Sequence, residues 1–299
     1  MNPSPPSHPL KSDLILLVGP GVIWGASFLF IAEGLEAMGP NAITFFRISV
    51  GFLTLAAFPQ ARRSVDPKLF SKILLLSIVW LAFPLSMFPY AERHVSSALT
   101  GMLNGANPLF VAAIAFLMTK EKPSRGVAIG LAVGFLGAII MALPTVNEGK
   151  NSVFGVVLIL CALASYGVAL NVAGPIQQKY GVVPLIWRAQ GLAILFTAPL
   201  GVPELLEAQW SLWPLLSLLA LGAFGTGIAY AMLAVAAGRV GPTKASATTF
   251  LIPPVSLALG LLIRNESVAI LSIVGGAICL VGAWLIRRAR MKPVVESGK

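Results

Sequence analysis

Two arginines interrupt apolar stretches of this 299-residue chain, and their guanidinium groups are the side chains best suited to bind a charged ligand there. Arg47 lies in the apolar run 41–58 and Arg188 in the run 182–203. A guanidinium group can bind a carboxylate or a phosphate through two parallel hydrogen bonds, which makes each arginine a candidate ligand-binding residue. If these runs cross a membrane as helices, each arginine also lies about 8–9 Å from a helix end, a depth from which a long side chain can reach the membrane surface. This depth favours a structural role for both arginines.

Polar side chains follow helical spacing in two other apolar runs. They are Ser97, Thr100, Asn104 and Asn107 in one run, and Ser246, Thr249 and Ser256 in the other. Amide and hydroxyl groups are costly when they face lipid, so we expect both polar stripes to face the interior of a helix bundle. Pro108 and Pro253 remove backbone hydrogen bonds in the same runs and leave carbonyl groups available. The stripes predict the wall of a binding cavity, and hydrogen bonding between packed helices is the alternative.

Four further side chains complete the candidate binding residues, namely Trp24, Met87, Tyr166 and Tyr230. The indole of Trp24 and the phenol of Tyr166 need a hydrogen-bond partner in the middle of an apolar run, and a cavity can supply one. Met87 lies in a run that contains Pro84 and Pro89, and Tyr230 follows several glycines. Flexible or aromatic side chains on bending helices suit a tolerant organic ligand, although each one can also be ordinary packing.

Motifs for catalysis and for metal binding are missing from the sequence. His8 and His94 are its only histidines, and Cys161 and Cys279 both lie in apolar runs, where they behave as small hydrophobic residues. We find no phosphate-binding loop, nucleophile elbow or zinc-protease motif. We therefore expect no catalytic residue, no metal site and no cofactor.

The composition places these residues in a membrane protein. Hydrophobic residues make up 57% of the chain and charged residues 11%, which excludes a soluble enzyme, a nucleic-acid-binding module and a disordered chain. Ten apolar runs are long enough to cross a bilayer as helices, and they span residues 14–32, 41–58, 73–91, 95–119, 126–147, 151–178, 182–203, 208–238, 245–263 and 267–286. The sequence therefore predicts an all-α integral membrane protein with ten transmembrane helices.

The basic residues predict how the helices are oriented. If both termini are cytoplasmic, sixteen of the 21 Lys and Arg residues lie in cytoplasmic segments and three lie outside. Cytoplasmic loops of membrane proteins are enriched in these residues. The bias predicts a multi-pass protein of the cell inner membrane, and it explains the net charge of +10 without nucleic acid as a partner.

An internal repeat divides the chain into two halves. Four residues recur at a distance of 145 positions, pairing Pro108 with Pro253, Glu121 with Glu266, Gly130 with Gly275, and Gly137 with Gly282. Earlier in the halves, Trp24 matches Tyr166, and Arg47 matches Arg188. Since five helices is an odd number, the second repeat enters the membrane from the opposite side. Inverted repeats of this kind build a central site that can open to either face.

The twice-repeated Pro–Glu–Gly–Gly pattern and the ten helices resemble the drug/metabolite transporter superfamily, and within it the EamA-type transporters. The resemblance implies repeats at 13–147 and 151–288, with cytoplasmic tails at 1–12 and 289–299. It also implies a secondary transporter, an exporter of a small metabolite such as an amino acid or related compound, that works by alternating access. An integral-membrane enzyme acting on a lipid-linked substrate and a non-transporting membrane subunit are the alternatives.

Two other repeated features are a row of glycines and a pair of glutamates. Gly126, Gly130 and Gly134 form a small-residue face that suits close packing within the chain, with homodimerisation as the alternative. Glu121 and Glu266 follow the fourth and ninth predicted helices, where we expect them to cap a helix or pair within loops.

Overall fold

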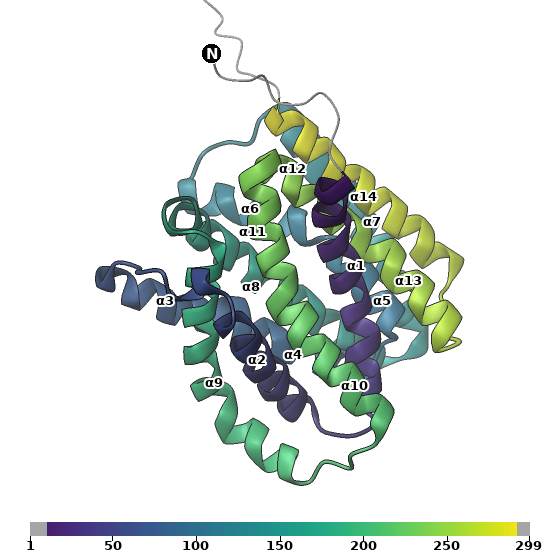
Figure 1. The fold of residues 1–299 in the computed structure, drawn as a ribbon. Helices are drawn as coiled ribbons and strands as arrows, with labels where there is room; N and C mark the ends of the chain where they lie inside the picture. Colours follow the sequence, from purple (N-terminus) through teal and green to yellow (C-terminus); the bar gives the residue numbers. More distant parts are fainter. Residues whose placement is uncertain (1–10, 292–299) are drawn as a thin grey trace, which may run out of the picture.

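The computed structural model describes residues 11–291, which form helices joined by short loops, with no strand in that range (Figure 1). The α-helices are α1 (Lys11–Gly34), α2 (Pro40–Ala56), α3 (Phe70–Leu76), α4 (Phe83–Glu92), α5 (Ser97–Asn104), α6 (Asn107–Thr119), α7 (Arg125–Glu148), α8 (Lys150–Tyr180), α9 (Val182–Leu206), α10 (Leu212–Ala220), α11 (Ala229–Val240), α12 (Pro242–Ala245), α13 (Ile252–Ile263) and α14 (Ile270–Met291). Shorter segments are η1 (Pro59–Arg62), η2 (Pro67–Leu69), η3 (Ser77–Ala82), η4 (Leu221–Ile228) and η5 (Ser246–Leu251).

Eight helical stretches of this region are long and apolar enough to cross a membrane. They are 13–34, 67–92, 125–148, 152–180, 182–206, 212–240, 246–263 and 270–289. Helices α5 and α6 pass the same test together but meet at an angle of 41°, and α2 is a shorter apolar helix of 17 residues. The all-α membrane fold is confirmed. The predicted count of ten is reached only when the bent pair is taken as one span and α2 as another.

Helix ends depart from the prediction near the termini. Helix α1 begins at Lys11 and α14 continues to Met291, so both helices extend into segments predicted to be tails. The remaining tail residues lie outside the described range.

Large apolar side chains cover the outside of the bundle, and Leu206, Leu262 and Ile270 are about four-fifths exposed, at 82%, 79% and 80%. A surface of this kind requires hydrocarbon around it.

Glycines let α7 and α14 pack closely along their length, as Figure 1 shows at one side of the bundle. A side chain added at Gly130 would meet Ile286 and Gly282, one added at Gly282 would meet the backbone of Gly134, and one added at Gly137 would meet Gly275 and the backbone of Cys279. The small-residue face is therefore used within the chain, as favoured over dimerisation. A homodimer, which stays a prediction, would need a different interface because this face is buried within the chain.

Helix irregularities occur at equivalent positions of the two halves. The segment η3 and the first six residues of η4 are separated by 144 residues, close to the repeat distance of 145, and both form wide π turns inside longer helices. In the second half, Gly222 and Gly227 allow close approach to Val50 and Thr54 of α2. A π turn leaves backbone carbonyl groups without their usual helical partners and is common at functional sites. The Pro- and Gly-rich helices thus contain irregular turns where the sequence favoured bending, and each remains one continuous span.

Candidate binding cavity

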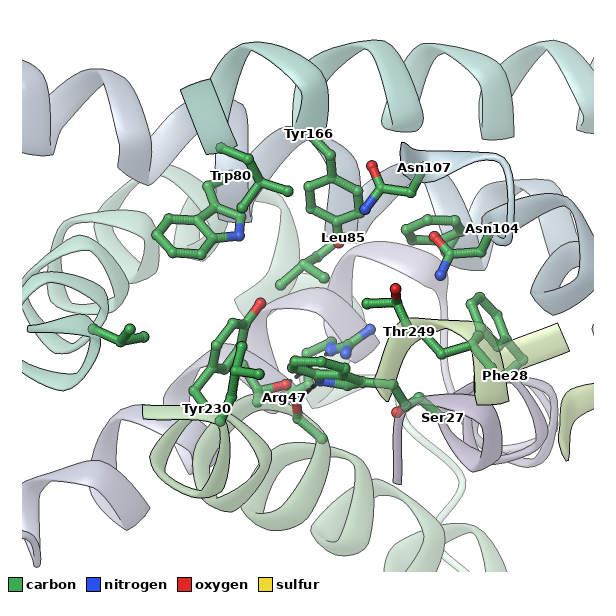
Figure 2. A pocket seen from close by; sticks show the side chains of 18 of the residues that line it. Ser27, Phe28, Arg47, Trp80, Leu85, Asn104, Asn107, Tyr166, Tyr230 and Thr249 are labelled. Atoms are coloured by element: carbon green, nitrogen blue, oxygen red, sulfur yellow. Dashed lines mark hydrogen bonds between the residues drawn. The ribbon is translucent and has the colours of Figure 1, made fainter. Parts of the chain in front are cut away.

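A cavity of about 250 Å³ lies between the helices of the two halves (Figure 2). Its wall is formed by Trp24, Ser27, Phe28, Ile31, Arg47, Trp80, Leu85, Phe88, Asn104, Asn107, Tyr166, Leu170, Gln177, Val182, Gly225, Thr226, Tyr230, Leu233, Ser246, Thr249 and Ile252. Eight of the ten candidate binding residues are therefore brought together, and they come from α1, α2, α5, α6, α8, α11 and η5. Asn104 and Asn107 of one polar stripe meet Ser246 and Thr249 of the other at this cavity, as Figure 2 shows for Asn104, Asn107 and Thr249. The other members of the stripes, Ser97, Thr100 and Ser256, do not line it.

Aromatic rings form much of the apolar wall. The ring of Tyr230 contacts both Trp24 and Trp80 edge-on, with centroids 5.4 and 5.8 Å apart. On the other side, Phe88 lies between Phe28 and Tyr166, at 5.5 and 6.0 Å. Three of these pairs are edge-to-face, an arrangement that aromatic rings favour, and the Phe88–Tyr166 pair is tilted at 32°. The wall is thus an aromatic surface suited to an organic group.

Arg47 is the one charged side chain among the described residues of the cavity wall. It projects from α2 and is only 5% exposed, and its Nε atom donates a 3.2 Å hydrogen bond to Thr226 Oγ1 in η4. Figure 2 shows its guanidinium between Tyr230, Thr249 and Ser27. The expectation that this side chain reaches the membrane surface is therefore wrong, because α2 directs it towards the cavity. Its two terminal nitrogens are the strongest donors available to a bound ligand.

Two backbone carbonyl groups of η4 accept hydrogen bonds from side chains of other helices and so hold this part of the cavity wall in place. The π turn of η4 leaves the carbonyl oxygen of Gly225 free to accept a 2.9 Å hydrogen bond from Trp24 Nε1. The carbonyl oxygen of Thr226 accepts a 2.6 Å bond from the buried Gln190. Trp24 thereby finds the partner that the sequence required. Asn107 differs, because its buried Oδ1 atom has no hydrogen-bond partner among the described residues.

Arg188 and Met87 do not line the cavity. The guanidinium of Arg188 donates to the carbonyl oxygens of Ala61 at 3.1 Å and Arg63 at 2.8 Å, so it fixes the segment that follows α2. This is the structural role favoured by the sequence. Met87 is half-buried and packs against the neighbouring hydrophobic core, because it lies on the face of α4 that points away from the cavity.

Several wall residues were missed by sequence reasoning. Phe28 and Ile31 follow Trp24 at helical spacings of four and seven, so the helical face of α1 carried a readable signal. Trp80 and Thr226 lie in the two π segments, and no sequence pattern announced those turns. Their position depends on helix geometry that only the folded chain shows.

The two ends of the bundle differ. At the end that carries Glu266, Arg264 pairs with Glu33 of α1 and with Glu36 in the turn that follows it, and Glu266 accepts hydrogen bonds from α5. Partial burial lowers the pKa of Arg264, but the hydrogen bonds and charges of Glu33 and Glu36 outweigh it, so the pKa is raised. At the opposite end, the cavity wall reaches the last turns of α8 and the start of α9 through Gln177 and Val182. The cavity therefore extends towards the end that carries Glu121.

The described residues hold no group of three or more His, Cys, Asp or Glu side chains that could bind a metal ion. The cavity itself combines an aromatic wall, one buried cation and a few amides and hydroxyls. Such a site can hold a small molecule with an anionic group and an organic body. A helical bundle that carries this site in its interior and an apolar belt outside is an integral membrane transporter in its general class.

Comparison with known proteins agrees with that class. The EamA-like transporter family model matches residues 11–143 and again 153–288, so the chain belongs to this family. The chain is 28% identical over 273 residues to an uncharacterized transporter, YdfC, of Bacillus subtilis, covering 89% of this chain and 87% of the relative. A probable terminal-alkyne amino-acid exporter of Streptantibioticus cattleyicolor is 24% identical, with 89% and 90% covered.

Two other similarities extend the comparison. A probable amino-acid metabolite efflux pump of Salmonella typhimurium is 23% identical over 276 residues, with 88% of this chain and 91% of the relative covered. A solved crystal structure superposes with a TM-score of 0.60 at 17% identity, over 96% of this chain and 99% of the other. That structural likeness establishes the shared fold.

Proposed function

We propose that the protein is a secondary transporter that exports a small carboxylate-bearing metabolite, such as an amino acid or related compound, by alternating access. The observation that carries this proposal is the central cavity with Arg47 as its one charged group among the described wall residues. The names of relatives that are described as an amino-acid exporter and an amino-acid metabolite efflux pump support the substrate class.

Alternating access requires two halves that can exchange conformations, and we propose inverted repeats at 13–147 and 151–288. Contacts between α7 and α14 support a two-fold relation, because they occur in reciprocal pairs. Gly130 approaches Gly282, and Gly137 approaches Gly275, which is the same contact with the two repeats exchanged. The distribution of Lys and Arg supports an inner-membrane location with both termini cytoplasmic, which would make the Glu121 end cytoplasmic.

The cavity suggests how such a substrate would be held. The two terminal nitrogens of Arg47 would bind the carboxylate, since bidentate pairing suits guanidinium and carboxylate geometry. The rings of Trp24, Trp80, Tyr166 and Tyr230 would contact the organic part, and their faces also attract an ammonium group. The unpaired Asn107 Oδ1 atom is an acceptor for a substrate N–H group.

Flux into proteoliposomes tests the proposal. The panel pairs each amino acid with its carboxamide and with the corresponding amine, so that the carboxylate is the only group changed. We expect saturable flux of the acids and little flux of the amides and amines. Equal flux of an acid and its amide would refute recognition of the carboxylate. Folded protein that carries none of the panel would refute the transporter proposal for this substrate class.

A further inference from the structure

Glu266 closes its end of the bundle by joining the two proposed repeats. Its Oε1 atom accepts hydrogen bonds from the backbone nitrogen and hydroxyl of Ser97, at 3.0 and 2.8 Å, and Oε2 accepts one from the backbone nitrogen of Ala98 at 2.8 Å. The carboxylate therefore caps the first turn of α5, as one of the sequence expectations proposed. A carboxylate at a helix N-terminus satisfies free amides and interacts favourably with the helix dipole. Because Ser97 and Glu266 belong to different halves, these bonds must break for this end to open.

The turn that carries Glu266 exists twice in the chain. Asn265 precedes it in a left-handed conformation, with φ of 51°, and Lys120 precedes Glu121 in the same conformation, with φ of 58°. These two are the only non-glycine residues with positive φ in the described range, and they are separated by 145 residues. The repeat has therefore preserved both the carboxylate and the strained backbone that presents it.

The start of α5, which binds Glu266, has an equivalent in the second half at the start of α12. In α5 the first turn is closed by a hydrogen bond of 3.0 Å from Thr100 N to Ser96 O. At the positions 145 residues later, Ala245 N donates to Gly241 O at 3.0 Å as α12 begins. Gly241 has no side chain to cap this helix, whereas Ser96 Oγ accepts from Leu99 N in α5.

Glu121 lacks the contacts that its counterpart makes. Its side chain is exposed, and none of the ion pairs or side-chain hydrogen bonds of the described residues involves its carboxylate. Its backbone nitrogen alone is engaged, at 3.4 Å from Thr119 Oγ1. The same motif thus binds a helix N-terminus at the Glu266 end of the bundle and binds none at the Glu121 end. The cavity extends towards the Glu121 end. We call a glutamate bound to a helix N-terminus of the other repeat a latch.

We propose that Glu121 is the latch of the opposite state: it caps the start of α12 and closes the Glu121 end when the Glu266 end opens. The proposal rests on the proposed alternating-access function. Pro242 stands at the position of Ser97 and has no N–H group, so the amides of Thr243 and Lys244 are the expected donors. The positive charge of Lys244 adds attraction for the carboxylate. The capping contacts of the two glutamates then form in turn, so that one end of the cavity is always closed. A cavity open at both ends would let solutes leak through the membrane.

Thiol labelling from outside measures which end is open. The reporter is Ile31→Cys in a Cys161→Ala, Cys279→Ala background, because Ile31 lines the cavity and is 1% exposed in the present state. We expect Glu266→Gln to raise labelling of intact cells by an impermeant reagent about tenfold, which corresponds to about 1.4 kcal/mol. Adding Glu121→Gln to that variant should lower labelling about tenfold again, because the outward-open state loses its latch.

Lys122→Gln in the Glu266→Gln variant is the matched control, because it changes the charge of the same loop and leaves both carboxylates in place. That control should label like Glu266→Gln alone. A double Glu variant that labels like Glu266→Gln alone would overturn the role of Glu121 and leave alternating access standing. If Glu266→Gln fails to raise labelling while proteoliposome flux persists, the latch is refuted and the transporter is not. Absence of flux in the unmodified protein would instead refute the proposed transport function.

Discussion

Replacement of Arg47 tests what the cavity recognises. Arg47→Gln removes the one charge of the described cavity wall, and Arg47→Lys keeps the charge but loses the two-pronged guanidinium. A hydrogen bond to a charged group contributes about 1.5–3 kcal/mol. The loss of two such bonds, at the lower figure, amounts to about 3 kcal/mol and predicts a rise of about 100-fold in KM for a carboxylate substrate. Lysine retains one strong bond, so we expect a rise of about tenfold for Arg47→Lys.

The same change should leave folding almost unaffected. Thr226 Oγ1 donates a second hydrogen bond to Leu221 O at 3.2 Å, so loss of the Arg47 contact does not leave the hydroxyl without a partner. Removal of a buried, unpaired charge also relieves a desolvation cost. We therefore expect a folded yield in detergent that matches the parent protein.

The assay is flux per folded molecule as a function of substrate concentration, with the acid and its carboxamide compared for every variant. Arg188→Gln is the control, because that side chain binds the carbonyl oxygens of Ala61 and Arg63 outside the cavity. It should lower yield without changing the preference for the acid. The reasoning fails if Arg47→Gln keeps the parent KM and still prefers the acid over the amide.

Three other predictions follow from packing, polarity and topology. Asn104→Ala should lower the free energy of unfolding by about 1 kcal/mol or less, because its amide makes no hydrogen bond to another described residue, yet it should change flux or selectivity per folded molecule. Gly137→Ala should lower the thermal midpoint, since the added Cβ collides with the backbone of α14 and overpacking costs about 1–3 kcal/mol, whereas Gly174→Ala meets no atom within 4 Å and should be neutral. An impermeant thiol reagent applied outside should modify Glu207→Cys and spare Arg63→Cys, and the reverse pattern would contradict the predicted orientation.

The sequence by itself determined the membrane fold and eight residues of the cavity wall. Apolar runs of sufficient length admit only helices that satisfy their own backbone groups, which is why the spans could be read directly. Polar residues such as Asn104 and Thr249 had to face the interior because lipid offers them no hydrogen bonds. The repeat at a distance of 145 residues also identified Glu121 and Glu266 as equivalent positions.

Only the tertiary structure decided between residues that the repeat makes equivalent. Arg47 and Arg188 match in sequence, yet one faces the cavity with Thr226 and the other binds the segment after α2. Helix direction and the neighbouring π turn select these partners, and neither is encoded in local spacing. Glu121 and Glu266 share one turn geometry, yet the carboxylate of Glu266 caps α5 whereas the side chain of Glu121 is exposed, and this difference depends on contacts between segments far apart in the sequence.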